Sequence, residues 1–288
     1  MIPRGRWQGM GTILRFNWPY YLAAGVVLLG AAAGLGSPVA LLWKVACGAA
    51  VVGAGHFLLV SLGVSHLVYD RSDLYRFRWL DRALGNVPPD HVVFCHSGFD
   101  DLSEALRLRL QPTPTGVGVN APLPVGRLPP GGDPATPAEG SGPTVVRRSP
   151  CWITLDHFDP KQMTEASIRR ARRFCPPTAG TVSAPFDAWP VESSSADVVF
   201  GLLAIHEFRS EGERTRWFAE ARRSLKPGGR VVLAEHLRDP ANFLAFGPGF
   251  LHFHSAASWR RCWEAAGLRA HDEFKITPWI RVFVLISP

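Results

Sequence analysis

The sequence predicts an α/β protein in which a two-helix transmembrane hairpin precedes a doubly wound sheet, mostly parallel with an antiparallel last strand. Three observations lead to this prediction. Two long apolar stretches precede residue 69, strand-like and helix-like segments alternate after residue 90, and two strand-like segments close the chain around a short turn. Strands that alternate with helices of about 10–15 residues are typical of a parallel sheet covered by helices.

The two apolar stretches predict a membrane anchor over residues 1–68, with transmembrane helices at about 18–36 and 45–68. Neither stretch contains Asp, Glu, Lys or Arg, and a bilayer core requires about 20 apolar residues per helix. Aromatic residues open the first stretch, as in an interfacial belt, and arginines flank both outer ends of the pair. The positive-inside rule then places both ends, and the domain that follows, on the cytoplasmic side of a cytoplasmic or inner membrane.

Two other interpretations of the apolar stretches stay open. The basic start and the small residues at 31–33 also fit a signal peptide, in which case residues 1–36 would be cleaved. A buried pair of helices in a soluble protein is the other. The membrane interpretation is favoured because the second stretch follows the first at once and itself requires a membrane.

The segment after the anchor is predicted to be an amphipathic juxtamembrane linker helix over residues 69–90. Leu74, Phe77, Leu80 and Leu84 recur at helical spacing, and the arginines between them could meet lipid headgroups.

A domain is predicted over residues 91–288. Its strand candidates are 91–96, 151–156, 179–184, 197–203, 230–236, 270–276 and 280–286, and its helix candidates are 100–110, 164–175, 211–225 and 255–267. The last two strands, joined by a short Thr-Pro-Trp turn, are expected to form an antiparallel hairpin. Residues 111–149 are rich in Pro and Gly without periodicity, which predicts a disordered insertion.

Charge and cysteine usage narrow the class of protein. The 288 residues carry a formal net charge of +7, much of it beside the apolar stretches. No basic tract is interleaved with aromatic residues, which disfavours nucleic acid as a partner. The five cysteines form no CxxC pair, which argues against a disulfide framework or a zinc ribbon and favours a reducing compartment.

The run from Asp197 to Leu233 contains an acidic residue that opens a strand, a helix rich in Glu and Arg, and an LKPGG turn before the next strand. Pro227 would stop the helix, and Gly228 and Gly229 would reverse the chain where a Cβ atom would clash. This combination resembles the class I S-adenosylmethionine-dependent methyltransferase family. The resemblance implies a Rossmann-like fold, S-adenosylmethionine as cofactor and a methyl-transfer activity.

The same resemblance implies the cofactor contacts. After the first strand the chain reads His-Ser-Gly-Phe-Asp in place of the family's three-glycine turn, and this is similar to a bacterial membrane-associated variant with a degenerate glycine motif. An acidic residue at the end of the second strand would accept hydrogen bonds from the ribose hydroxyls; Asp156 is the first choice and Asp159 the second. The implied cofactor contacts are Gly98, Phe99, Asp100, Asp156, His157 and Asp187.

His206 and Glu207 follow the fourth strand and are the candidate catalytic residues. A general base is needed only if the acceptor loses a proton, and His206 suits a hydroxyl acceptor; a packing or capping role for His206 is an equally open alternative. The apolar segment 236–255 is expected to form a lid or substrate wall. Its position beside a membrane anchor suggests a small, apolar or lipid-like acceptor.

Three further alternatives were weighed. A metal site could draw on a set of histidines and acids whose spacing matches no metal motif, and no metal is predicted. That set is His206, His236, His252 and His254 with Glu207 or Asp239. A non-catalytic membrane scaffold with a degenerate methyltransferase fold is the runner-up. A membrane-tethered nucleic-acid methyltransferase lacks an Asn-Pro-Pro-aromatic motif after the fourth strand. The sequence defines neither the methyl acceptor nor the oligomeric state.

Overall fold

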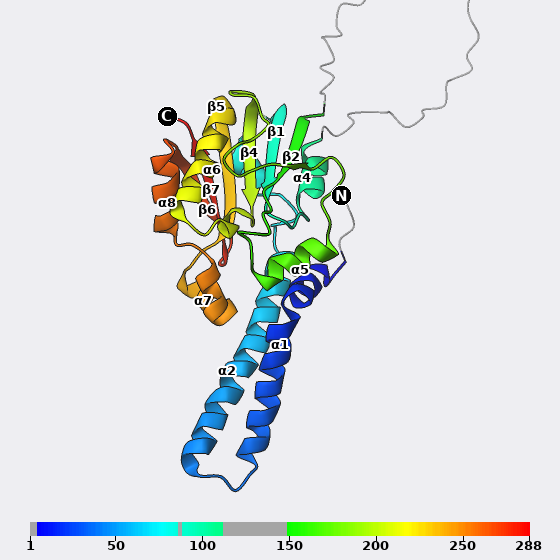
Figure 1. The fold of residues 1–288 in the computed structure, drawn as a ribbon, viewed down its shortest axis with the longest axis vertical. Helices are drawn as coiled ribbons and strands as arrows, with labels where there is room; N and C mark the ends of the chain where they lie inside the picture. Colours follow the sequence, from blue (N-terminus) through cyan, green and yellow to red (C-terminus); the bar gives the residue numbers. More distant parts are fainter. Residues whose placement is uncertain (1–4, 86–87, 112–148) are drawn as a thin grey trace, which may run out of the picture.

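The computed structural model describes residues 5–85, 88–111 and 149–288. One seven-stranded sheet has the order β3-β2-β1-β4-β5-β7-β6 (Figure 1). The strands are β1 (His91–His96), β2 (Cys151–Asp156), β3 (Val182–Ser183), β4 (Ala196–Leu202), β5 (Leu225–His236), β6 (Arg269–Thr277) and β7 (Ile280–Ile286). The first five pair in parallel, and β7 runs antiparallel to β5 and β6. The predicted fold class is confirmed.

Alternate residues of the buried strands point to opposite faces, as a period of two requires. Val93 and Cys95 pack in one apolar cluster, together with aromatic rings from helices that follow β4 and β5. Val92 and Phe94 pack in the other cluster, on the opposite face of the sheet. The helices after β1 are α4 (Ser103–Leu110), α5 (Ala166–Phe174), α6 (Glu211–Ser224), α7 (Pro240–Phe246) and α8 (Ala256–Ala265), with short 3₁₀ helices η2 (Ile205–Glu207) and η3 (Gly247–His252).

Two helices, α1 (Gln8–Leu35) and α2 (Leu41–His66), form a long antiparallel pair that projects from the sheet domain (Figure 1). Both are long and apolar enough to cross a membrane by length and composition. The first helix starts well before the predicted residue 18. Its start is stabilised by Asp70, whose carboxylate accepts hydrogen bonds from the backbone N–H of Gly9 (2.6 Å) and Met10 (3.0 Å). Asp70 follows α2 and is about 60 residues away along the chain, so the local sequence does not reveal this cap.

The single linker helix predicted over residues 69–90 is wrong for the described part of that segment. A π-helical turn, η1 (Leu67–Arg71), continues α2, and a short α3 (Leu80–Leu84) follows only after irregular turns. The Ser72 hydroxyl donates to the Val68 carbonyl (2.6 Å) and accepts from the Leu74 N–H (3.1 Å), and this competition with the backbone ends the helix. Leu74 is fully buried in the domain core, so the apolar stripe serves packing. The predicted insertion at 111–149 lies, except for its two end residues, outside the described residues.

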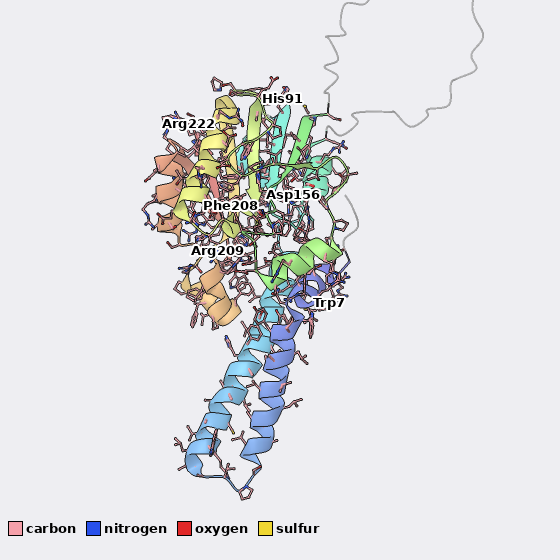
Figure 2. The ribbon with its side chains drawn as sticks, viewed as in Figure 1. Trp7, His91, Asp156, Phe208, Arg209 and Arg222 are labelled. Atoms are coloured by element: carbon pink, nitrogen blue, oxygen red, sulfur yellow. The ribbon has the colours of Figure 1, made fainter. Side chains whose placement is uncertain are left out.

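The carboxyl ends of the parallel strands point toward the α1–α2 hairpin. Figure 2 places His91, the first residue of β1, at the end of the sheet away from the hairpin, and Asp156, the last residue of β2, nearer to it. Ligands of open α/β sheets bind beyond the carboxyl ends of the strands. The site is therefore expected between the sheet and the end of the α1–α2 hairpin that adjoins it.

Candidate active site

A cavity of about 650 Å³ lies at this edge of the sheet. Its wall combines side chains from the turn after β1, the loop after β4, helices α1, α2 and α5, and the α7–η3 segment. Phe99, Asp100, His206 and Glu207 line it, so four of the predicted site residues come together around one space. The predicted wall formed by the segment 236–255 is also present, through His236 and residues of α7 and η3.

The turn after β1 presents unpartnered polar atoms to this region. Ser97 and His96 are buried and line the cavity. The Ser97 hydroxyl and Nε2 of His96 have no hydrogen-bond partner in the described part of the chain, and Nδ1 of His96 lies 3.5 Å from the Asp156 carboxylate. Burial lowers the pKa of His96, although Asp156 and Asp100 nearby oppose this shift. Asp100 accepts from the Ser103 N–H (2.9 Å) and so begins α4. Buried polar groups normally have partners, so this turn fits a polar ligand.

The end of β2 is closed. Asp156 is 2% exposed, and its carboxylate accepts hydrogen bonds from the backbone N–H of Gly98 (3.2 Å) and Phe158 (3.1 Å) and pairs with Arg172. Gly98 has φ +93°, and a Cβ atom there would lie 2.6 Å from the Phe158 ring. Gly98 and Asp156 therefore sit behind the cavity wall and do not line it.

The two remaining predicted contacts also lie off the cavity. His157 is buried, its Nδ1 is 2.9 Å from the Ala184 carbonyl, and its ring stacks on Trp189; burial lowers its pKa to about 4. Asp187 forms an ion pair with Arg216 at 3.2 Å. The structure thus separates the predicted cofactor residues into two on the cavity and four behind or beside it.

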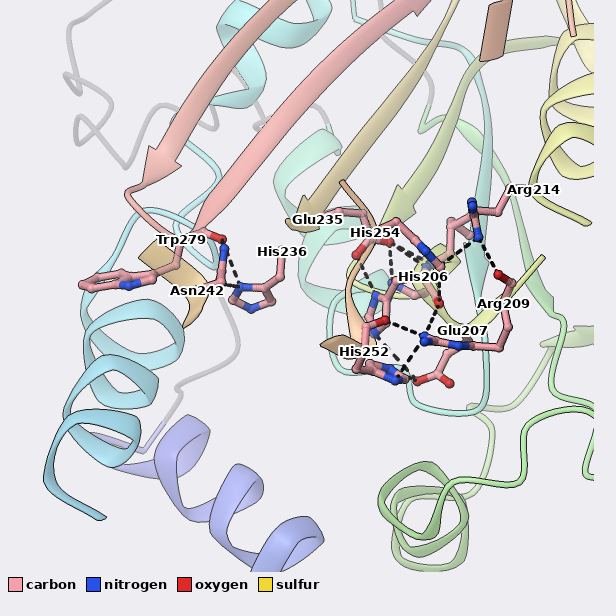
Figure 3. Close-up of polar contacts among 12 residues, drawn as sticks. His206, Glu207, Arg209, Arg214, Glu235, His236, Asn242, His252, His254 and Trp279 are labelled. Carbon is pink, nitrogen blue, oxygen red and sulfur yellow. Dashed lines mark hydrogen bonds and ion pairs between the residues drawn. The ribbon is translucent and has the colours of Figure 1, made fainter. Parts of the chain in front are cut away.

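Glu235, at the end of β5, holds His206 in place and was not among the predicted residues. One carboxylate oxygen accepts hydrogen bonds from the N–H groups of Ala204 (3.2 Å), Ile205 (2.8 Å) and His206 (3.2 Å). The other lies 2.7 Å from Nδ1 of His206 (Figure 3). Because an ionised carboxylate can only accept, Nδ1 of His206 carries a hydrogen toward Glu235, and Nε2 is the ring nitrogen that can accept a proton.

His252, from the end of η3, joins this cluster (Figure 3). Its Nδ1 lies 2.6 Å from Glu165 and its Nε2 lies 3.5 Å from Glu207, which is also 3.7 Å from Nε2 of His206. Burial disfavours the charged ring, but the hydrogen bonds that the ring donates to Glu165 and Glu207 prevail and raise the pKa of His252 to about 9. A cationic His252 between two carboxylates therefore ties η3 to the start of α5 and to η2 at neutral pH.

The ligand atoms of His206, Glu207 and His252 all lie within 4.8 Å of one another, and this is the part of the described chain that could hold a metal ion. The other two histidines of the metal alternative lie elsewhere. His236 bonds to Tyr69 (2.9 Å) and Asn242 (3.0 Å). His254 accepts from Arg214 (2.9 Å), and burial together with the Arg214 charge lowers its pKa to about 3.

Residues 153–233, from β2 to the middle of β5, match the methyltransferase-domain family. These residues therefore resemble a methyltransferase domain. This match confirms the predicted class and, with it, S-adenosylmethionine as the cofactor of the domain. It spans both the closed carboxylate Asp156 and the candidate base His206.

Solved structures similar to this methyltransferase include an S-adenosylmethionine-dependent methyltransferase from Aquifex aeolicus, with 11% identity, a TM-score of 0.45 and coverage of 74% of this chain and 89% of that one. Another is the mitomycin 7-O-methyltransferase, with 14% identity, a TM-score of 0.49 and coverage of 100% and 74%. No curated protein matches the sequence.

Proposed function

We propose that the protein is a membrane-anchored methyltransferase that transfers a methyl group from S-adenosylmethionine to a small, apolar, lipid-like acceptor. One observation carries the proposal: a single cavity reaches from His206 and Glu207 to side chains of the two apolar helices. Phe16, Tyr20, Tyr21 and Phe57 of α1 and α2 line the same space as the catalytic candidates. An acceptor that lies among the helices could thus reach the catalytic residues without crossing water.

The exposed surface of α1 and α2 supports anchoring. Leu29, Leu42 and Leu59 are 73%, 82% and 78% exposed, and soluble monomers rarely expose contiguous apolar surface of this extent. The two helices approach closely at Gly34, where a Cβ atom would lie 2.7 Å from the Cys47 sulfur, as small residues permit in membrane helix pairs. The arginines at the domain end of the pair favour a domain on the cytoplasmic side.

The proposed acceptor carries a hydroxyl group, because the cluster supplies a proton acceptor. The sulfonium cofactor supplies an already activated methyl group, so the chain's task is to position the acceptor, exclude water and take up a proton. S-adenosylmethionine would supply the methyl group, its S–CH3 bond breaking as the new O–CH3 bond forms and S-adenosylhomocysteine leaving as a neutral thioether. Nε2 of His206 would take up the hydroxyl proton. The buried carboxylate of Glu235 then stabilises the imidazolium through Nδ1, and the His252 bridge holds η3 over the cavity.

For the cofactor, the cavity wall offers Ser97, Phe99 and Asp100. Their unpartnered or carboxylate oxygens and the Phe99 ring fit a polar molecule that also carries an aromatic base. The predicted ribose contact through Asp156 requires Arg172 to leave the carboxylate, since the side chain is otherwise enclosed. His157 and Asp187 remain predicted contacts, although neither lines the cavity.

Methylation of lipid extracts tests the proposal. Purified full-length protein is incubated with S-adenosylmethionine labelled in its methyl group and with separate fractions of a membrane lipid extract. We expect label in an organic-soluble product, lost with His206→Ala and retained with His271→Ala, an exposed histidine on β6. Labelling confined to water-soluble acceptors would contradict the lipid-like acceptor and leave methyl transfer intact.

One observation favours a second candidate, the non-catalytic scaffold: the carboxylate predicted to hold the ribose is already paired with Arg172. Calorimetric titration of S-adenosylmethionine into the folded protein separates the two. Saturable binding, weakened about tenfold or 1.4 kcal/mol by Asp156→Ala, supports the enzyme. Absence of binding at millimolar cofactor, with unfolding still cooperative, would favour the scaffold.

A further inference from the structure

Helix α7 has the opposite polarity from a helix on a soluble protein. Asn242 is fully buried and bonds to Asp239, His236 and the Trp279 carbonyl, whereas Phe243 and Leu244 on the same helix are 49% and 60% exposed. A surface helix ordinarily turns its apolar stripe inward and its polar residues to solvent. Here the polar Asn242 faces the protein, and two of the three large apolar side chains of the helix, Phe243 and Leu244, face away from it.

The exposed apolar side chains extend into η3. Leu251 is 54% exposed, and the ring of Phe250 packs against Phe243 with centroids 5.1 Å apart. After residue 68, where the second apolar stretch ends, only five large apolar side chains of the described chain are strongly exposed, and three of them belong to this segment. Residues 240–251 contain no Asp, Glu, Lys or Arg. We refer to Phe243, Leu244, Phe250 and Leu251 as the α7–η3 apolar patch.

The patch is continuous with α2. Helix α7 lies beside α2, on the hairpin side of the sheet (Figure 1). Nε2 of His56 lies 2.8 Å from the Leu244 carbonyl, which is one of the carbonyls that the end of a helix leaves without a partner. His56 is ten residues before the end of α2, or about 15 Å along the helix axis. A polar side chain and an orphan carbonyl thus satisfy each other next to apolar helix surface, as an apolar medium demands.

We propose that the α7–η3 apolar patch is a third membrane contact, which lies in the interface of the same bilayer that α1 and α2 cross. The occupant is a lipid surface, and the inference rests on the proposed anchoring by α1 and α2. The segment also forms one wall of the cavity through Phe246, Pro248 and Gly249. Lipid contact at this place brings acyl chains to the rim of the cavity, so an acceptor dissolved in the bilayer has a short path to the site.

Depth-dependent fluorescence quenching tests this contact. The three accessible cysteines, Cys47, Cys151 and Cys175, are replaced by serine, and the buried Cys95 and Cys262 stay. Single cysteines are then introduced in the full chain and labelled with an environment-sensitive fluorophore. The protein is reconstituted in phosphatidylcholine and phosphatidylglycerol vesicles, with or without bromine atoms on the acyl chains. Leu244→Cys and Leu251→Cys probe the patch.

Two further positions calibrate the measurement. Val52→Cys, in the middle of α2 and 71% exposed, reports insertion of the hairpin, and Arg269→Cys, exposed at the far end of the sheet, reports the aqueous background. We expect brominated lipid to quench labels at 244 and 251 to an extent comparable with 52 and well above 269. Quenching at 52 with 244 and 251 at background would overturn the third contact and keep the anchor. Background quenching at 52 as well would overturn both.

Discussion

Strands β2 and β5 each end in a buried carboxylate, and the two are used in opposite ways. Asp156 accepts from two backbone N–H groups and pairs with Arg172 behind Phe158. One oxygen of Glu235 accepts hydrogen bonds from three backbone N–H groups, and the other accepts from Nδ1 of His206, which lines the cavity. Arg172, on α5, thus separates the β2 carboxylate from the cavity, whereas the β5 carboxylate bonds to a histidine that lines the cavity.

This difference assigns separate tasks to the two strand ends. A carboxylate bonded to Nδ1 of His206 fixes the tautomer and the orientation of the ring, which suits proton uptake at Nε2. A carboxylate that Arg172 occupies must exchange its partner before it binds a hydroxyl group. In the proposed function, the proton transfer belongs to the end of β5, and the end of β2 controls the affinity for the cofactor.

The largest effect is expected at the open end. His206→Ala removes the proposed proton acceptor, and general-base catalysis contributes about 10²–10⁴-fold, so the methylation rate should fall by at least about 100-fold. Cofactor affinity by calorimetry should stay within about twofold, a difference below 0.5 kcal/mol, because His206 acts on the acceptor. Equal losses of rate and cofactor affinity would contradict the separation of the two ends; His271→Ala provides the matched histidine control.

A pH-dependent stability loss is expected from His252. Its pKa is about 9 in the folded protein and about 6.5 in an unfolded chain, so the folded state binds more protons between these values. The stabilisation is complete below about pH 6.5, declines as pH rises and is lost above pH 9; it amounts to about 3 kcal/mol at most. Thermal unfolding of the detergent-solubilised protein should show this alkaline decline.

The matched variant is His252→Gln, which keeps a hydrogen-bonding side chain without a titratable charge. Its Tm should vary less between pH 6.5 and 9 than that of the parent protein. An unchanged alkaline decline in His252→Gln would show that other groups cause it. The acid limb should persist in both proteins, because burial lowers the pKa of His157 and His236 to about 4 and the unfolded chain then binds more protons below pH 6.5.

Substitution of Gly98 tests how tightly the end of β2 is packed. Gly98 and Gly180 both have positive φ, at +93° and +85°, but only the Cβ of Gly98 would meet another atom, the Phe158 ring at 2.6 Å. Gly180→Ala should cost about 1–2 kcal/mol for its backbone conformation alone, and Gly98→Ala should cost about 1–3 kcal/mol more through overpacking. Equal unfolding free energies for the two variants would mean that Phe158 moves freely and that the end of β2 is not closed.

The sequence predicted the strands well because their apolar runs and the LKPGG turn are local signals. A Cβ atom at Gly229 would lie 3.0 Å from the Lys226 carbonyl and 3.1 Å from the Ala196 carbonyl, which agrees with the steric reason given for this glycine. The linker helix over 69–90 was wrong because a stripe at helical spacing does not report whether lipid or a core covers it. The hydroxyl of Ser72 decided the break.

The site was predicted in part, since its decisive contacts join distant residues. His206 and Glu207 were singled out by their place after a strand. Glu235 is 29 residues away from His206, and Glu165 contacts His252 across 87 residues. Glu235 had a usable signal: it is an acidic residue at the end of a buried strand, the same reason that selected Asp156. No local pattern could have shown that Arg172, on a basic helix, pairs with Asp156.

Removal of Arg172 is expected to give the smallest effect and the sharpest test of the closed end. Arg172→Ala frees Asp156, so ribose hydroxyls no longer compete with a guanidinium, and the affinity for S-adenosylmethionine should rise by up to about tenfold, or 1.4 kcal/mol. Arg173→Ala, its exposed neighbour, should leave the affinity unchanged under the same calorimetric titration. A fall in affinity with Arg172→Ala alone would mean that Arg172 itself holds the cofactor, and the two carboxylates would then both serve the site through the side chain that they bind.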